Sequence, residues 1–377
     1  MKIAIVRGKH LNKFEMQLYE PLAKTHQLVG FGSLRPFQDQ FAFPVVKLPS
    51  PMDLPNFPYK MPLLNRLMID GQYLFGLEAR LRGFDIAHSA ETYLHFTQQC
   101  LNAKKRGWVK KVVVTVFENI PFANEGIWGR QKFKQRAIKE VDHFIAISQR
   151  SKEALILEGA DPKKISIINQ YIDTAAFRPS SKLKVVSSKL NILFVGRLEL
   201  YKGVYEVIFA FRKLLADPDL KGCDLALTMI GDGSEKAKLL ELERRMRIEE
   251  RVTHKTVPYD RMPAEYQKAA IFVAPSRATR HWQEQFSTVL LEAQASGLPI
   301  ITTWSGAIPE NIGEAGALVQ PADFSALAVG LKKFILDPAL RQKFGRKSRQ
   351  RAVAVFDISI GSRKLAKVYE KTLYSHS

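Results

Sequence analysis

The chain has 377 residues, with 57 Lys and Arg against 37 Asp and Glu, which gives a formal net charge of +20. This length predicts two domains of roughly 150–200 residues. A hydrophobic fraction of 46% and a charged fraction of 25% exclude a disordered chain, a collagen-like repeat and a small disulfide-stapled scaffold. The positive charge predicts an anionic partner, and composition leaves nucleic acid, an acidic membrane surface and a phosphorylated substrate open.

The cysteine count and the apolar runs indicate the compartment. Cys100 and Cys223 lie far apart and have no metal-ligand neighbours at useful spacing, so we expect two unpaired core thiols and no metal site. No apolar run approaches the roughly 18–20 residues that span a bilayer, and the first residues do not resemble a signal peptide. We therefore expect a cytoplasmic protein.

Short β-branched, apolar stretches alternate with helical periodicity along the chain, which predicts parallel α/β sheets. The first series of expected strands comprises residues 2–8, 26–32, 41–48, 84–90, 110–117, 141–148 and 164–170. The second series comprises residues 190–198, 223–233, 251–257, 269–276, 299–304 and 315–320. The last expected element is a helix over 362–375, with Leu365, Val368, Tyr369 and Leu373 facing inward.

The polar, serine-rich stretch 178–190 between the two series has the composition of a linker. We therefore expect an N-terminal domain over 1–183, a second domain over 184–356, and a C-terminal helix over 357–377. The pattern alone does not decide the packing partner of this helix, and packing back on the N-terminal domain is the candidate placement. Doubly wound sheets bind ligands beyond the carboxyl ends of their strands. Two such domains in series predict a cleft between them, lined by loops that follow strands.

The first motif with chemical meaning is VGRLELYKG over 195–203. Gly196 ends an expected strand and lets a ligand approach the backbone, while Arg197 and Lys202 supply two cations that suit a diphosphate. On charge pattern alone, a solvated basic loop is the competing interpretation. The position after the first strand of the second series favours the ligand site.

The second motif is EQFSTVLLEAQASG over 284–297, in which Glu284 precedes an expected helix and Glu292 lies inside it. Ser287 or Thr288 is placed to cap the helix. Two carboxylates near this end would repel phosphate, so we expect them to accept hydrogen bonds from sugar hydroxyls. A Glu284 that only stabilises the helix dipole and a surface Glu292 form the alternative.

The third motif, IGDGSE over 230–235, predicts a strand, a tight glycine turn and a helix that starts near Ser234. It lacks the lysine of a phosphate loop and the third glycine of a dinucleotide fingerprint. Gly231 therefore either approaches a ligand or simply makes the turn.

Taken together, these motifs carry a family resemblance. The second half contains, in order, VGRLELYKG, the IGDG turn, AAIFVAPS, the E-x7-E pair of Glu284 and Glu292, and ASGLPIITTWSGAIPE. The first half matches more loosely, in FDIAHS, VVVTVFEN and YIDTAAFRP. The chain resembles a retaining GT-B glycosyltransferase of glycosyltransferase family 4, also called glycosyl transferases group 1, over nearly its whole length.

The resemblance implies an α/β fold of the GT-B type, with two Rossmann-like doubly wound domains facing across a cleft. It implies a UDP- or GDP-hexose donor held by the second domain, an acceptor held by the first, retention of configuration, and neither metal nor cofactor. Arg197 and Lys202 would stabilise the leaving diphosphate, Glu284 would contact sugar hydroxyls, and Glu292 the ribose. The remaining donor-binding residues implied are Gly196, Gly231, Gln285, Phe286, Ser287 and Thr288.

The sequence departs from the family pattern at three places. Gln285 and Ser287 replace two glycines beside Phe286, and Phe117 and Glu118 follow a strand where many members have a histidine. The turn after the first strand keeps one glycine. Residues that could take over contacts with the acceptor or sugar are Gly8, His88, Glu118 and Asn119, and a structural role is the alternative for each.

Residues 101–150 hold eleven Lys and Arg against four acids. Segment 129–141, and the apolar segment 58–68 with its two cations, each fit either a helix packed on its sheet or one lying on anionic lipid. No nucleic-acid motif accompanies this charge, so we expect no nucleic-acid partner. The resemblance adds peripheral contact with the inner face of a membrane as an expectation, because many relatives act on lipid-linked acceptors.

The leading functional hypothesis is transfer of a hexose from a nucleotide sugar to a glycan or lipid-linked acceptor in cell-surface polysaccharide or glycolipid synthesis. The alternative is a catalytically idle GT-B scaffold that binds an anionic partner or a membrane through its basic face. A GT-B epimerase or phosphorylase is disfavoured by the E-x7-E motif with its paired cations.

Overall fold

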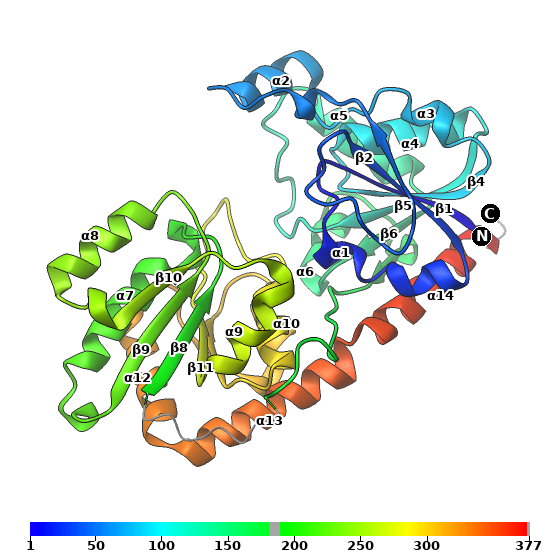
Figure 1. Ribbon diagram of the computed structural model, residues 1–377. Helices are drawn as coiled ribbons and strands as arrows, with labels where there is room; N and C mark the ends of the chain where they lie inside the picture. The colour runs from blue at the N-terminus through cyan, green and yellow to red at the C-terminus, as the bar shows by residue number, and fades with distance from the viewer. Residues whose placement is uncertain (181–188, 375–377) are drawn as a thin grey trace. The chain divides into compact units, whose positions relative to one another are not determined.

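The computed structural model describes residues 1–180 and 189–374. It divides into two compact units, the first formed by Met1–Gln170 with Ile358–Ser377 and the second by Tyr171–Asp357 (Figure 1). The expected boundary at 183/184 lies outside the described residues. The units change over at Gln170 and again at Asp357, so the C-terminal helix is part of the first unit.

A seven-stranded parallel sheet forms the centre of the first unit, in the order β3-β2-β1-β4-β5-β6-β7. Its strands are near-continuous apolar runs, as expected for a parallel sheet that is covered on both faces. They are β1 (Lys2–Gly8), β2 (Gln27–Ser33), β3 (Val45–Leu48), β4 (Phe84–Ala90), β5 (Val109–Val116), β6 (His143–Ala146) and β7 (Ile165–Ile167).

All pairs of neighbouring strands are parallel, so all carboxyl ends meet at one edge. The α-helices of the first unit are α1 (Lys13–Met16), α2 (Lys60–Met68), α3 (Leu77–Arg80), α4 (His95–Lys105), α5 (Arg130–Glu140), α6 (Gln149–Leu157) and α14 (Ile358–Tyr374). Short 3₁₀ turns are η1 (Glu20–Lys24), η2 (Pro51–Asp53) and η3 (Pro162–Lys164).

Helix α14 returns to the first unit and packs against β4, β5 and η1. Of its expected inward-facing residues, Leu365, Val368 and Tyr369 are buried and Leu373 is half-buried. The Tyr369 hydroxyl lies 2.6 Å from Nδ1 of His88 on β4. This contact joins the last helix of the chain to the centre of the first sheet.

The second unit is built on a six-stranded parallel sheet in the order β10-β9-β8-β11-β12-β13. The strands are β8 (Lys189–Val195), β9 (Asp224–Ile230), β10 (Val252–Lys255), β11 (Ile271–Ala274), β12 (Ile300–Thr303) and β13 (Ala317–Val319). The α-helices are α7 (Val204–Leu215), α8 (Lys236–Met246), α9 (Met262–Lys268), α10 (Thr288–Ala295), α11 (Ile308–Ile312), α12 (Phe324–Leu336) and α13 (Pro338–Val355). The 3₁₀ turns are η4 (Leu200–Lys202), η5 (Pro218–Leu220), η6 (Glu249–Arg251), η7 (Tyr259–Arg261) and η8 (Gly313–Ala315).

Every expected strand stretch contains a strand, which confirms the parallel α/β reading of the sequence. The expected strand 41–48 is shortened to Val45–Leu48 because Pro44 cannot donate to a strand ladder. The expectation for the cysteines is half wrong: Cys100 is buried on α4, whereas Cys223 is exposed just before β9.

Two further features concern residues 1–180 and 189–374. No helix among them combines the length and apolar character that a membrane crossing requires. Within the same ranges, no three His, Cys, Asp or Glu side chains come together in a way that could hold a metal ion.

Candidate functional site

The loops that follow β8, β9, β11 and β12 meet at the carboxyl edge of the second sheet. They contain the three motifs that the sequence singles out, because parallel strands place all their following loops at the same edge. Two close backbone approaches join these loops. A Cβ atom on Gly231 would lie 1.9 Å from the carbonyl oxygen of Gly196, and one on Gly306 would lie 2.0 Å from that of Glu284. Glycine is therefore required at both positions.

Lys202 and Glu284 form the polar centre of this edge. The Lys202 ammonium lies 2.7 Å from Oε2 of Glu284, and both side chains are largely buried. The Ser276 hydroxyl donates to the same carboxylate oxygen at 2.8 Å. The backbone of Glu284 is held as well, since its N–H donates to Ser305 Oγ at 3.3 Å and its carbonyl accepts from Ala307 N at 2.9 Å.

Arg197 is the second cation of the VGRLELYKG motif. Its side chain is exposed and its guanidinium lies over the ring of Tyr201, 5.2 Å from the ring centroid. Among the described residues no ion pair of Arg197 is found. The sequence thus places two cations, Arg197 and Lys202, around one strand end.

Glu292 lies inside α10 and is buried. Its Oε2 accepts a hydrogen bond from the Tyr266 hydroxyl at 2.6 Å. Burial raises the pKa of Glu292 to about 7, and the hydrogen bond from Tyr266 only partly offsets this. The expected contact of Glu292 with a ribose stays a prediction.

The start of α10 differs in detail from the expectation. Ser287 occupies the N-cap position and the helix begins at Thr288, but no side chain caps the helix by a hydrogen bond. Instead, the Ser287 carbonyl accepts from Asn311 Nδ2 at 3.0 Å. Phe286 is buried with its ring 5.8 Å from that of Phe356, and Gln285 is half-buried. Donor contacts of this stretch stay predictions.

Three of the four residues expected on the acceptor side lie at the carboxyl edge of the first sheet. Gly8 makes a left-handed turn after β1, where a Cβ would lie 2.9 Å from Oε1 of Gln72. The loop after β5 contains Glu118 and Asn119. The Glu118 carboxylate folds back on this loop and accepts from the N–H groups of Asn119 and Ile120, at 3.0 and 3.1 Å.

The position of His88 corrects the expectation that it contacts an acceptor. It is completely buried inside β4, with Nδ1 bonded to the Tyr369 hydroxyl and Nε2 2.7 Å from Thr115 Oγ1. Burial holds the pKa of His88 well below its usual value. Because both ring nitrogens have partners, His88 is a neutral core residue.

Glu91 is a buried carboxyl group at the carboxyl edge of the first sheet, and the sequence analysis did not single it out. It directly follows β4 in a left-handed conformation with φ of 56°, and its Oε1 accepts from Phe117 N at 2.9 Å and Glu118 N at 3.2 Å. Burial, and then the negative charge of Glu118, raise its pKa to about 8. A carboxylate immediately after an apolar strand was the signal that could have found it.

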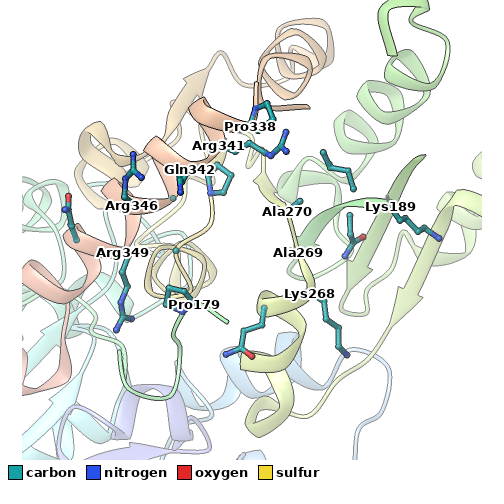
Figure 2. A pocket seen from close by; sticks show the side chains of 17 residues that line it. Pro179, Lys189, Lys268, Ala269, Ala270, Pro338, Arg341, Gln342, Arg346 and Arg349 are labelled. Carbon is teal, nitrogen blue, oxygen red and sulfur yellow. The ribbon is translucent and has the colours of Figure 1, made fainter. Parts of the chain in front are cut away.

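Figure 2 shows a cavity of about 1020 Å³ in the second unit. It lies at the amino ends of β8, β11 and β12, the opposite edge of the sheet from Lys202 and Glu284. Arg349, labelled in Figure 2, donates to the carbonyls of Thr174, Phe177 and Ala295. It therefore joins α13 to the segment 174–177 and to the end of α10. None of the expected site residues lines this cavity.

Comparisons with known proteins agree with this geometry. The family "Glycosyl transferases group 1" matches residues 179–351, and "Glycosyltransferase Family 4" matches residues 25–176. The chain is 29% identical to a glycogen synthase of Mycobacterium tuberculosis over 62% of this chain and 55% of the relative. It is 29% identical to the capsular polysaccharide biosynthesis glycosyltransferase CapM of Staphylococcus aureus over 61% and 62%. The chain therefore spans little more than half the length of these relatives.

A solved structure with a similar fold is that of HepE from Anabaena, whose title describes a complex with UDP-glucose. It superimposes with a TM-score of 0.78, covers 98% of this chain and all of its own, and is 18% identical. At this identity the likeness supports the fold alone. Since the two family matches together cover most of both units, the chain belongs to the GT-B glycosyltransferases of family 4.

Proposed function

We propose that the protein is a retaining hexosyltransferase that takes its sugar from a UDP- or GDP-hexose. The observation that carries this proposal is the grouping of Arg197, Lys202 and Glu284 at the carboxyl edge of the second sheet. Two cations beside a carboxylate suit a ligand with a diphosphate at one end and hydroxyls at the other. The UDP-glucose complex of HepE supports such a donor by analogy of fold.

In the proposed reaction, the bond between the anomeric carbon and the β-phosphate oxygen breaks. Lys202 and Arg197 stabilise the negative charge that develops on the departing diphosphate. The acceptor hydroxyl attacks the same face of the sugar, and its proton passes to the departing phosphate, so configuration is retained. Because these two cations supply the compensating charge, we propose that no metal ion takes part.

Glu284 would bind the sugar end of the donor. Its backbone is fixed by Ser305 and Ala307, and its carboxylate is oriented by Ser276 and Lys202. A carboxylate held this rigidly accepts hydrogen bonds from hydroxyls at a defined place, which positions the anomeric carbon. Glu292, eight residues further along the chain and inside α10, is proposed to bind the ribose.

We propose a glycan or lipid-linked acceptor, in the synthesis of a cell-surface polysaccharide or glycolipid. The exposed apolar side chains on and near α2 favour the lipid-linked class: Tyr59 and Leu67 are 82% and 72% exposed, and Leu63 is 45% exposed. By contrast α5, the other basic segment, buries Ala137, and Val141 directly after it is buried as well, so α5 is a packed helix. The α2 surface would hold the enzyme on the cytoplasmic face of an anionic membrane.

The direct test is thermal stability of the purified protein with UDP, GDP and ADP and their hexose conjugates. A ligand at 100 times its dissociation constant stabilises the native state by about 2.7 kcal/mol, which is readily measured. We expect a selective shift with one base, and stronger protection by its hexose conjugate. No shift with any nucleotide would contradict the proposal and favour an idle scaffold, the reading to which Gln285 and Ser287 also point.

A further inference from the structure

Two aromatic rings join the VGRLELYKG loop to the loop before Glu284. The rings of Tyr201, on η4, and Trp282 have centroids 4.4 Å apart. Both side chains are half-buried. The family motifs explain the glycines, the cations and the glutamates of this edge, but they assign nothing to this aromatic pair.

Both cations of the site rest on these two rings. The Arg197 guanidinium lies 5.2 Å from the centroid of Tyr201, and the Lys202 ammonium lies 5.0 Å from that of Trp282 and 5.9 Å from that of Tyr201. A ring face attracts a cation through its quadrupole and carries no net charge. It therefore orients a cation without neutralising it. This leaves the positive charge of Arg197 available to a phosphate, whereas Lys202 is also paired with Glu284 Oε2 at 2.7 Å.

The loop that carries Trp282 is fixed in place. Arg277 N donates to the carbonyl of Tyr201 at 2.9 Å, and the Arg277 guanidinium pairs with Glu206 at 2.5 Å. Thr279 and Trp282 close a turn, with Thr279 N donating to Trp282 O at 2.8 Å and Trp282 N donating to Thr279 Oγ1 at 2.9 Å. The indole position is thus set by the chain on both sides.

We propose that Tyr201 and Trp282 are positioning residues that hold Arg197 and Lys202 in the orientation that receives the donor diphosphate. This inference rests on the proposed function, because it takes a nucleoside diphosphate as the ligand. It also assigns the loop 277–283 to the donor site.

The test is calorimetric titration with UDP, or with the diphosphate that the thermal panel selects. Trp282→Leu and Tyr201→Leu should each raise the dissociation constant about tenfold, which is the scale of a partly desolvated cation–π contact. Trp282→Phe and Tyr201→Phe keep a ring and should stay within about threefold of the wild type. Trp108→Leu is the matched control, because Trp108 carries Arg82 and Arg106 at 5.0 and 4.9 Å in the first unit.

A double-mutant cycle separates positioning from folding. In a Lys202→Met background, Trp282→Leu should weaken diphosphate binding by clearly less than in the wild type. The reason is that the Lys202 ammonium, which the Trp282 ring positions, is already absent. Melting temperatures measured without ligand show whether a variant is destabilised. If the leucine variants unfold, the phenylalanine variants Trp282→Phe and Tyr201→Phe still test the inference. Unchanged affinity in folded Trp282→Leu and Tyr201→Leu, with wild-type binding intact, would overturn the inference alone. Absence of binding by the wild type would overturn the proposed function as well.

Discussion

The ammonium of Lys202 lies 2.7 Å from the carboxylate of Glu284, although 82 residues separate them in the chain. A diphosphate that binds Lys202 has to share this cation with Glu284. Ser276 remains as a second partner of the carboxylate when the cation moves. This arrangement couples the phosphate end and the sugar end of the proposed donor site.

We expect Glu284→Gln and Lys202→Met to affect binding in opposite directions. Neutralising Glu284 frees Lys202 from its carboxylate partner, so UDP affinity should stay the same or rise by a few fold while sugar transfer falls at least about 100-fold. Lys202→Met should weaken UDP binding about tenfold or more. Calorimetry with UDP and a radiolabelled transfer assay measure the two effects. Unchanged turnover in both variants would refute this site assignment.

Gly306→Ala should damage the site through backbone contact. The new methyl group would lie 2.0 Å from the Glu284 carbonyl oxygen at a residue with φ of 53°, so the Glu284 loop must move. We expect a clear loss of melting temperature and of nucleotide binding. Gly76→Ala is the control, because φ is 80° there and nothing lies within 4 Å. It should show only the backbone strain, about 1 kcal/mol, with nucleotide binding retained.

The strands and the donor motifs could be predicted because their signals are local. Apolar runs such as 190–198 mark buried parallel strands, and the sheet order then brings Lys202 and Glu284 to one edge. The sequence could also predict that α14 buries Leu365 and Tyr369, since helical spacing shows this directly. Helical spacing alone does not decide which sheet the helix covers, because it shows which face of the helix is buried and not which element packs against that face.

The first-unit site could not be predicted in the same way. His88 reads as a polar residue at a strand end, yet the hydroxyl that occupies its Nδ1 comes from Tyr369, at the other end of the chain. Glu91 has one local signal, its position directly after an apolar strand, but its burial and its bonds to two N–H groups of another loop do not show in the sequence. Both depend on tertiary contacts that sequence spacing does not encode.

Glu91→Gln should change how stability depends on pH. The folded carboxyl of Glu91 keeps its proton up to a pKa of about 8, against 4.5 for a free side chain. Between these two values the unfolded chain loses the proton first, so rising pH destabilises the wild type. Glutamine cannot ionise. The melting temperature of the variant minus that of the wild type should therefore rise from pH 5 to pH 8, whereas exposed Glu153→Gln should show no such trend.

Tyr369→Phe should destabilise the first unit. The change removes the hydroxyl 2.6 Å from Nδ1 of His88 and leaves a fully buried nitrogen without this partner, at a cost of about 1–3 kcal/mol. Denaturant unfolding measures the loss, and Tyr374→Phe, 68% exposed on the same helix, is the control. Equal stability of the two variants would mean that the hydroxyl contributes nothing to docking α14.

The last prediction concerns the exposed apolar side chains of α2, which we expect to bind a lipid surface. Leu63 and Leu67 are exposed beside the cation Arg66, and α2 is tied to the start of α5, where Arg130 donates to Asn65 Oδ1 at 3.3 Å. Gly129 lies against Ile69 just after α2, and its neighbour Trp128 is 79% exposed. Burying two leucines in a lipid interface contributes roughly 1.5–3 kcal/mol each at most.

We therefore expect the protein to sediment with phosphatidylglycerol vesicles and less with phosphatidylcholine vesicles, since the chain has a formal net charge of +20. Leu63→Ser with Leu67→Ser should reduce binding at least about tenfold. Leu157→Ser, at a leucine 63% exposed on α6 of the same unit, controls for a general loss of apolar surface. Equal binding by the α2 double variant and the control would assign membrane contact to charge alone, and equal binding to both lipids would remove the electrostatic part of the argument.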